Sequence, residues 1–181
     1  MALAARSWTA SPSSPSRPRW AWDKCLRRRG SFGGPPSCAT APRLKGSDGS
    51  DLLEGGKGDD RLLGGSQADH LDGGDGEDML SGGSGNDWLE GGAGNDTMQG
   101  DLGADDFVFD LAANAGARDV IADFDASEDR LHLASSGESL ASLLGQAVQQ
   151  GSDVHFAFAD GAELWVAGVD LAALEARTDL L

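Results

Sequence analysis

The 181-residue sequence contains very little cysteine and no long apolar run. Its two cysteines, Cys25 and Cys38, both precede residue 46, so no disulfide framework holds the rest of the chain together. No stretch of about 18 apolar residues is present, and we therefore expect no membrane-spanning helix. The opening residues, MALAARSWTASPSSPS, lack the apolar segment of a secretory signal peptide, so we expect no export through a cleaved N-terminal signal.

The common catalytic motifs are missing as well. None of the three histidines, His70, His132 and His155, is followed by glutamate, so the H-E-x-x-H pattern of a zinc protease is absent. No G-x-S-x-G nucleophile elbow and no Walker or dinucleotide-binding glycine pattern occurs. We therefore expect no catalytic residues and no enzyme activity in this chain. Since His132 and His155 lie between apolar neighbours that face the other side of their strands, we interpret both histidines as exposed.

Basic residues are scarce after residue 45. Residues 1–45 carry a net charge of +8, whereas residues 46–181 carry −24. A change of sign this large marks a boundary between segments. The acidic part repels nucleic acid and anionic lipid, so we expect neither as a partner, but it attracts cations.

Residues 1–45 are rich in Pro, Ser, Arg and Gly and show no periodicity, which predicts a disordered leader. Two alternatives stay open. Trp20, Trp22 and the arginines at 27–29 interleave aromatic and cationic groups, as in an arm that binds nucleic acid. The segment is equally explained by a misplaced start that replaced an upstream domain.

Seven consecutive blocks of nine residues occupy positions 46–108. Position 1 of every block is glycine, and position 4 is glycine in all blocks but one, where Gln67 replaces it. Position 6 is always aspartate: Asp51, Asp60, Asp69, Asp78, Asp87, Asp96 and Asp105. Position 8 is always large and apolar: Leu53, Leu62, Leu71, Leu80, Leu89, Met98 and Phe107. A repeat this regular indicates stacked supersecondary units.

Each column of the repeat has a physical meaning. Glycines at positions 1, 2 and 4 allow positive φ and close backbone approach, which predicts a turn. Positions 7–9 predict a strand of about three residues whose middle side chain points inward. Two blocks make one coil of about 18 residues, so each block stacks on its second neighbour and the units bury one continuous apolar ladder.

This stack needs a source of free energy besides apolar burial. One apolar side chain per block buries too little surface to offset the backbone entropy of a glycine-rich chain. Residues 46–108 also carry a net charge of −14, and stacking brings the position-6 carboxylates together. Calcium accepts carboxylate and carbonyl oxygens in a forgiving geometry. Seven turns in two columns leave five gaps, so we expect about five Ca²⁺ ions.

The pattern GGxGxD-x-U-x, with U a large apolar residue, resembles the calcium-binding nonapeptide of the repeats-in-toxin, or hemolysin-type, family, which occurs in the C-terminal portion of type I secreted proteins. The resemblance implies an all-β fold. Its core is a parallel β-roll, a right-handed β-helix of the repeats, followed by a β-rich C-terminal cap with short helices.

The resemblance also implies a ligand set. In this family, carbonyls at positions 2 and 4 and the Asp of one turn face carbonyls at positions 1 and 3 and the Asp of the turn one coil later. Besides the seven position-6 aspartates, the implied ligands are Gly56, Gly58, Gly73 and Asp75; Gly74, Gly76, Gly91 and Ala93; Gly65, Gly82 and Ser84; and Gly83, Gly85, Gly100 and Leu102. Gln67 at position 4 and Ser47 at position 2 depart from the pattern, so we expect strained turns and weaker sites there.

The C-terminal segment predicts strands at 105–110, 118–125 and 129–134, a helix at 138–151, a strand–turn–strand at 152–169 and a helical turn at 170–176. It resembles the region after the repeats in type I secreted proteins, and its tail, DLL at 179–181, is similar to their uncleaved export signals. Asp119, Asp123, Asp125 and Asp129 form either a further calcium site or a solvated loop.

The sequence thus predicts three segments: a leader at 1–45, a calcium-binding roll at 46–108 and a cap with a secretion signal at 109–181. We expect a secreted monomer that folds on calcium outside the cell and uses the type I secretion machinery. The alternatives are a non-catalytic remnant of a larger exoenzyme or toxin (protease, lipase, epimerase or hemolysin), or a calcium-dependent adhesion module whose partner is an extracellular polysaccharide or a cell surface.

Overall fold

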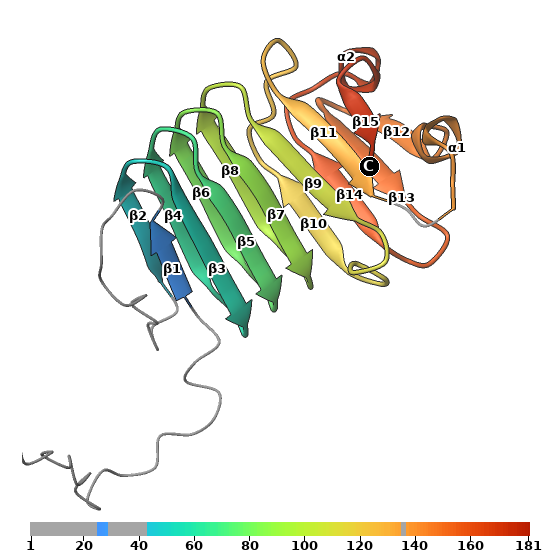
Figure 1. Cartoon of the computed structure of the whole chain (residues 1–181). Coiled ribbons are helices and arrows are strands. Elements are labelled where there is room, and N and C mark those ends of the chain that lie inside the picture. Colours follow the sequence, from blue (N-terminus) through green and yellow to red (C-terminus); the bar gives the residue numbers. More distant parts are fainter. Residues whose placement is uncertain (1–24, 29–42, 135–136) are drawn as a thin grey trace, which may run out of the picture.

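The computed structural model describes residues 25–28, 43–134 and 137–181 (Figure 1). The strands before the cap are β1 (Cys25–Arg28), β2 (Leu44–Asp48), β3 (Asp51–Lys57), β4 (Arg61–Ser66), β5 (His70–Asp75), β6 (Met79–Ser84), β7 (Trp88–Ala93), β8 (Thr97–Leu102) and β9 (Asp106–Asp110). The cap contains β10 (Arg118–Ile121), β11 (Arg130–Ala134), α1 (Leu140–Leu144), β12 (Ala147–Gln150), β13 (Asp153–Ala157), β14 (Glu163–Val166), α2 (Leu171–Glu175) and β15 (Thr178–Leu180).

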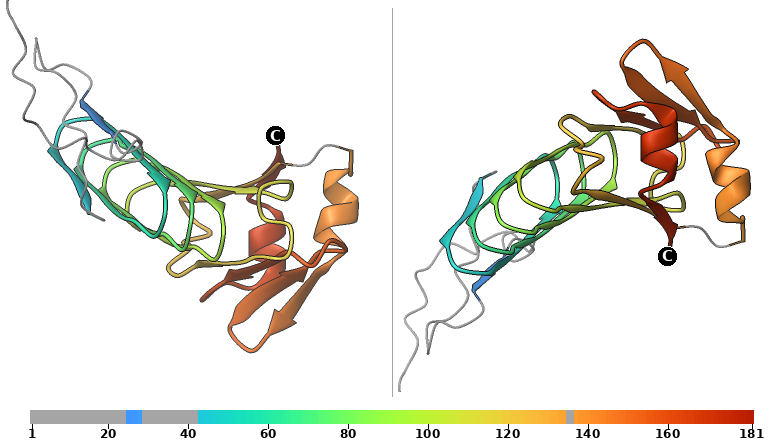
Figure 2. Two further views of the ribbon diagram at one scale, coloured as in Figure 1. Left: turned by 90° about the horizontal axis from the view of Figure 1, so that it is seen from below. Right: turned by 90° about the horizontal axis from the view of Figure 1, so that it is seen from above.

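The strands alternate between two sheets that face each other and are joined by turns along both edges (Figures 1 and 2). The first sheet has the order β1-β3-β5-β7-β9-β11-β15, and the second has the order β12-β13-β14-β10-β8-β6-β4-β2. From β2 to β11 every neighbouring pair within a sheet is parallel. This is a β-roll, and it confirms the predicted fold class.

The register within each sheet repeats every 18 residues. Leu53 pairs with Leu71 and Leu71 with Leu89 in the first sheet. Leu62 pairs with Leu80 in the second sheet. The nine-residue repeat therefore builds half a coil, and each block stacks on its second neighbour, as the sequence predicts.

The strands of the roll are longer than the three residues expected from positions 7–9. Strands β4 to β8 each contain six residues, because positions 1–3 of the next block continue the ladder. Gly65 pairs with Gly83, for example, one coil further on. The glycines at positions 1 and 2 thus belong to paired strands as well as to turns, which brings neighbouring backbones into close contact at these positions.

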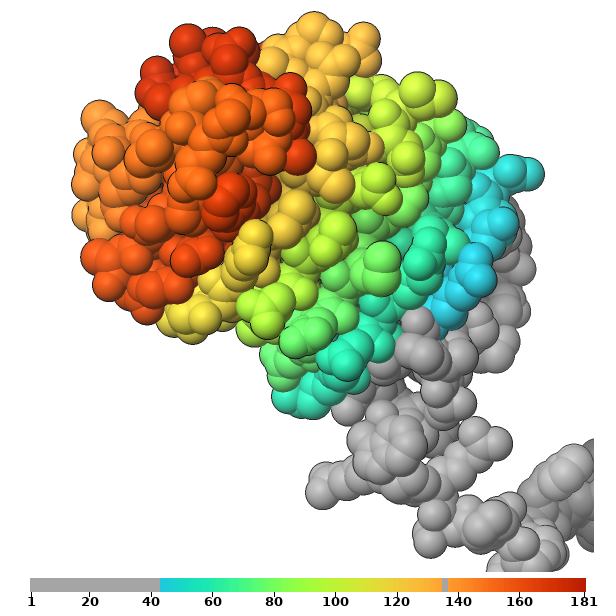
Figure 3. All heavy atoms as spheres, turned by 180° about the vertical axis from the view of Figure 1, so that it is seen from behind, coloured from blue at the N-terminus to red at the C-terminus, as the bar shows by residue number. Residues whose placement is uncertain are grey.

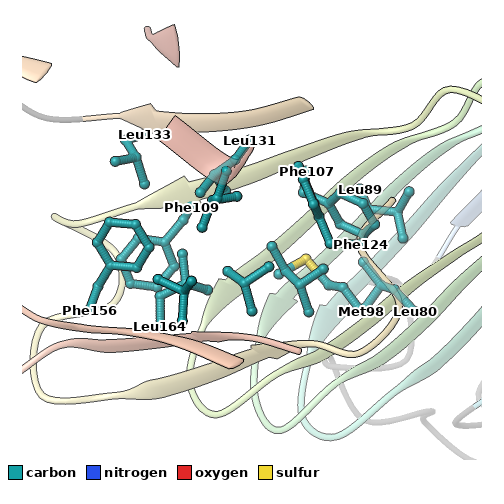
Figure 4. Packing of buried hydrophobic residues seen from close by; sticks show 14 of the residues in the cluster. Leu80, Leu89, Met98, Phe107, Phe109, Phe124, Leu131, Leu133, Phe156 and Leu164 are labelled. Carbon is teal, nitrogen blue, oxygen red and sulfur yellow. The ribbon is translucent and has the colours of Figure 1, made fainter. Parts of the chain in front are cut away.

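The core is a narrow ladder of apolar side chains between the two sheets (Figure 4). All seven position-8 side chains are at most 2% exposed. Toward the cap the ladder widens to include Phe109, Phe124, Leu131, Phe156 and Leu164, which close one end of the roll. The prediction that position 8 faces inward is confirmed.

The cap covers the C-terminal end of the roll (Figure 3). The predicted hairpin is present, since β13 and β14 pair antiparallel across the Asp160-Gly161 turn. The predicted helix at 138–151 is too long: α1 ends before Gly145, and residues 147–150 form β12, which pairs with β13. The helix is capped at Gly145, and the backbone of the following residues pairs with β13 as an antiparallel strand. Among the described residues, neither helix has the length or apolar character that a membrane crossing requires.

The interpretation of residues 1–45 as a disordered leader needs correction at two places. Cys25–Arg28 form β1, which pairs antiparallel with β3 at the edge of the first sheet. Leu44 lies in β2, pairs with Leu62 and is 3% exposed, because it fills the next place in the apolar ladder. The other residues before Arg43 lie outside the described ranges, including Trp20 and Trp22 of the alternative nucleic-acid arm.

Candidate metal centre

Two columns of buried aspartates run along the edges of the roll. The position-6 residues Asp51, Asp69, Asp87 and Asp105 form one column, and Asp60, Asp78 and Asp96 form the other; each is at most 4% exposed. In both columns, Oδ1 of one aspartate accepts the backbone N–H of the aspartate 18 residues earlier, with N–O distances of 2.6–2.8 Å. The sequence repeat therefore places carboxylates next to each other once per coil.

The second carboxylate oxygen of several of these side chains is buried without a hydrogen bond. Oδ2 of Asp69, Asp87 and Asp96 has no hydrogen-bond partner among the described residues. Burying an ionised carboxylate oxygen without a partner is costly, and a bound cation removes that cost. These oxygens are the first indication that the turns hold a metal ion.

Backbone carbonyls approach the same places. A Cβ built on Gly73 would lie closer than 3.0 Å to both the Gly91 carbonyl oxygen and Oδ2 of Asp78. On the other edge, a Cβ on Gly64 would lie equally close to the Gly82 carbonyl oxygen and Oδ2 of Asp69. A carboxylate of one turn and a carbonyl of the next coil thus converge on a small cradle that only glycine leaves open.

The other predicted carbonyls also lie along the stacking direction. A Cβ on Gly74 would meet the Gly56 carbonyl oxygen closer than 3.0 Å, and Gly83 and Gly65 repeat this relation. The position-3 carbonyls already accept hydrogen bonds: Gly58 N–H donates to Asp75 (2.6 Å), Gly76 N–H to Ala93 (2.8 Å) and Gly85 N–H to Leu102 (2.8 Å). A carbonyl oxygen has two lone pairs, so these bonds leave room for a metal contact.

The donor set fits calcium. Within the described part of the chain, no three side chains of His, Cys, Asp or Glu come together as a metal cluster, so a cation in the turns depends on carbonyl oxygens. Calcium takes about 6–8 oxygen ligands and accepts carbonyls and carboxylates together, whereas zinc prefers nitrogen and sulfur. The residues that the sequence predicts as ligands therefore supply the right atoms.

One position-1 carbonyl was missing from the predicted ligands. A Cβ built on Gly46 would meet the Gly64 carbonyl oxygen and Oδ2 of Asp51. A Cβ built on Gly55 would likewise meet the Gly73 carbonyl oxygen and Oδ2 of Asp60. Its position in the repeat is the signal that could have identified it. The two alternatives for Asp119, Asp123, Asp125 and Asp129 stay predictions. The structure places Asp119 on the column of Asp96 and Asp129 on the column of Asp105.

Electrostatics also favour a cation. Burial raises the pKa of Asp69 and Asp96 to about 6, although a backbone N–H bond opposes the rise in each case. Burial raises the pKa of Asp105 to about 7, with a smaller contribution from the Asp129 carboxylate. Because burial penalises the ionised form, the carboxylate columns destabilise the metal-free roll at neutral pH and above, and a bound divalent cation relieves this penalty.

Three residues stand where the repeat otherwise has a glycine with positive φ. Ser47 and Asp101 at position 2 have φ of 90° and 68°, and Gln67 at position 4 has φ of 73°. All three adopt the left-handed conformation, at a cost of about 1–2 kcal/mol per residue. The expectation that Gln67 strains its turn is confirmed.

Replacing Gln67 by glycine is expected to stabilise the roll. Relief of the left-handed strain outweighs the added flexibility of the unfolded chain, for a net gain of about 0.5–1 kcal/mol. Urea unfolding at a fixed, saturating calcium concentration measures the change. The matched control is Ser66→Gly at the adjacent exposed position, whose φ is not positive and where glycine should cost about 0.5–1 kcal/mol. Equal effects of the two variants would show that Gln67 is not strained.

An aromatic column lies on the outer face of the first sheet. The Trp88 ring stacks on His70, with centroids 6.1 Å apart, and on His132, with centroids 5.3 Å apart. His132 Nε2 lies 2.7 Å from Oδ1 of Asp106, and the side chain is 9% exposed. The interpretation of His132 as exposed is therefore wrong, because Trp88 and Asp106 cover it.

A family model described as the RTX calcium-binding nonapeptide repeat matches residues 45–80 and 72–107. Among solved structures, the AlgE6R3 subunit of the Azotobacter vinelandii mannuronan C5-epimerase is 32% identical over 67% of this chain and 78% of that chain, with a TM-score of 0.50. The extracellular lipase LipA from Serratia marcescens is 16% identical over 72% of this chain and 40% of that chain, with a TM-score of 0.39.

No curated protein matches the chain significantly. The family match covers the seven nonapeptides up to residue 107 and includes all the position-6 aspartates of both columns. Buried carboxylate oxygens, converging carbonyls and the matched repeat all point to the same metal. The chain belongs to the RTX calcium-binding nonapeptide repeat family, and its β-roll is a calcium-binding module.

Proposed function

We propose that the chain is the calcium-folded module of a secreted protein. The roll of residues 46–108 folds when calcium binds outside the cell, and the cap of residues 109–181 completes the roll and carries the signal for type I export. The observation that carries the proposal is the set of buried Oδ2 atoms without hydrogen-bond partners at Asp69, Asp87 and Asp96. These oxygens make the roll incomplete without a cation.

About five calcium ions complete the roll, one in each gap between stacked turns. Three gaps lie in the column of Asp51, Asp69, Asp87 and Asp105, and two lie in the column of Asp60, Asp78 and Asp96. Each gap joins two carboxylates to the carbonyls of two turns. The gaps that involve Ser47 and Gln67 are the weakest, because their turns are strained.

Calcium-coupled folding gives export a direction. Where free calcium is low, the acidic repeats gain too little from apolar burial to fold, and a metal that binds only the folded state supplies the missing free energy. The chain then passes through a narrow secretion channel unfolded and folds on the calcium-rich side. A monomer suffices for this role, since every proposed site lies within one chain.

The proposed secretion role is tested by measuring whether export depends on the C-terminal tail. Leu180 and Leu181 are 40% and 57% exposed, as a signal read by a transporter requires. In a bacterium with a type I secretion system, the full chain should reach the medium, and Leu180→Asp with Leu181→Asp should keep it inside the cell. The control is Val148→Asp, because Val148 is 56% exposed on the same cap but outside the tail.

Unchanged export of the tail variant would contradict the secretion role. A lower level of both variants inside the cell would point to lost stability, so the intracellular and secreted amounts are measured together by immunoblot. Calcium binding is measured on the same purified chains, which separates a failure of export from a failure of the metal sites.

A second candidate is the non-catalytic portion of a larger exoenzyme, favoured by the similarity to a subunit of a mannuronan C5-epimerase. A catalytic motif in the genomic sequence upstream would support it. A calcium-dependent adhesion module is a third candidate, and the stacked rings of His70 and Trp88 would be its contact face. A polysaccharide pull-down with and without chelator, repeated with Trp88→Ala, distinguishes it from the first.

A further inference from the structure

The outward side chains of the roll differ between its two sheets. Positions 7 and 9 of each block point away from the apolar ladder, and the two sheets lie on opposite sides of the roll (Figure 2). In the first sheet these positions hold four acids and no lysine or arginine; the acids are Glu54, Asp72, Glu90 and Asp106. In the second sheet they hold one arginine and no acid; the residues are Arg61, Leu63, Met79, Ser81, Thr97 and Gln99. The nine-residue repeat therefore carries a charge pattern with a period of 18.

The outward side of β2, β4, β6, β8 and β10 is the basic face of the roll. Lys45 on β2 and Arg118 on β10 lie on either side of Arg61, and all three residues are exposed. None of the three forms an ion pair with a described residue. Asp101, at the end of β8, borders this face, where its carboxylate accepts the Ser81 hydroxyl at 2.7 Å. In a chain with a net charge of −16, a face of unpaired cations indicates contact with a negatively charged partner.

The outward side of β3, β5, β7 and β9, the acidic face, shows the opposite pattern. Glu54 lies directly opposite Asp72 in the register, and Asp72 lies directly opposite Glu90. Like charges at directly opposed positions repel each other, and none of the three forms an ion pair with a described residue. Trp88 is half-buried on this face, and Met79 on the basic face is 50% exposed. Each face thus combines unpaired charges of one sign with a large apolar side chain.

The two faces also match in size and spacing. Strands about 4.8 Å apart place the charges of both faces at multiples of one interval. Each face measures about 20 Å by 20 Å, so two faces in contact bury about 800 Å² in total, which is typical of weak and transient contacts. Because the faces lie on opposite sides of the roll, the same contact can repeat from copy to copy.

We propose that folded copies of this chain associate head to tail, with the basic face of one copy on the acidic face of the next. The contact brings Lys45, Arg61 and Arg118 of one copy to the carboxylates of its neighbour's acidic face. It depends on calcium for two reasons. Both faces exist only in the folded roll, and each bound divalent ion removes two units of the negative charge with which the copies repel each other. The inference rests on the proposed calcium-coupled folding in this respect alone.

Sedimentation velocity of the full chain in millimolar calcium tests the association. The sedimentation coefficient should rise with protein concentration at about 0.05 M salt. In about 1 M sodium chloride it should fall to the value of the monomer, because the Debye length shrinks to about 3 Å. A folded monomer under all these conditions would overturn the inference and leave the calcium role intact. A chain without β-signal in calcium would overturn both, so circular dichroism distinguishes the two failures.

Charge reversal tests the two faces separately. Arg61→Glu blocks the basic face and Glu90→Arg blocks the acidic face, so neither variant should associate alone. Their equimolar mixture should form dimers that do not grow, since one intact face of each sign remains. The matched control Arg130→Glu makes the same charge change on the first sheet, where Arg130 pairs with Asp106, and should associate as the wild type does.

Circular dichroism in calcium verifies that each variant is folded. Association of Arg61→Glu alone, or a mixture that stays monomeric, would overturn the inference. A wild-type monomer that binds dextran sulfate through Arg61 would assign the basic face to an anionic polymer and would overturn it as well.

Discussion

In a calcium chelator, the chain is expected to lose most of the far-UV circular dichroism signal of its roll. Residues 46–108 carry a net charge of −14, and their carboxylates are stacked in buried columns. Without a cation these columns repel each other, and seven apolar side chains cannot offset the entropy of the glycine-rich backbone. Loss of calcium should therefore unfold the roll cooperatively, and adding calcium back should restore it.

The comparison metal is magnesium. It demands near-ideal octahedral geometry at about 2.0–2.1 Å and gives up its water reluctantly, whereas the carbonyl-rich gaps suit a larger and more tolerant ion. At equal concentration, magnesium is expected to restore little of the β-signal. Full recovery with magnesium would show that charge screening is sufficient and that specific coordination is not required.

Gly92→Ala is expected to prevent calcium-induced folding at moderate calcium concentrations. Gly92 has φ of 96°, and a Cβ there would lie closer than 3.0 Å to the carbonyl oxygen, the nitrogen and the carbonyl carbon of Gly74. Backbone atoms of the neighbouring coil cannot move aside without breaking the ladder. The clash and the strained φ together should cost about 3 kcal/mol or more.

Gly49→Ala is the matched control. Gly49 has φ of 105°, close to that of Gly92, but a Cβ there would meet no atom within 4 Å. This variant should lose only the conformational cost, about 1–2 kcal/mol, and should still fold at higher calcium. Calcium titrations followed by circular dichroism compare the midpoints. Similar midpoints for the two variants would contradict the close stacking of position-2 glycines.

The repeat made most of the roll predictable. In a strand, the position-8 side chain faces inward when positions 7 and 9 face outward. Because blocks stack every 18 residues, Leu53, Leu71 and Leu89 form one inward ladder. Position 6 recurs with the same period, which fixed the membership of both aspartate columns. The same pattern of turn glycines, aspartate and apolar residue occurs in seven blocks, so few folds other than a regular stack fit it.

The junction with the cap could not be predicted in the same way. Asp119 and Asp129 continue the two columns, but they follow Asp96 and Asp105 by 23 and 24 residues, because longer loops replace the glycine turns. A search for period nine therefore misses them. The burial of His132 was missed for a related reason, since Trp88 and Asp106 reach it only through strand pairing across the sheet.

The dependence of the roll on calcium is tested most directly by hydrogen exchange, with and without calcium, at matched pH. The informative amides are those of Asp60, Asp69 and Asp78, whose N–H groups donate to carboxylates of the next coil. With millimolar calcium these amides should be strongly protected, and in a chelator they should exchange freely. Equal protection in both conditions would contradict the conclusion that calcium holds the turns together.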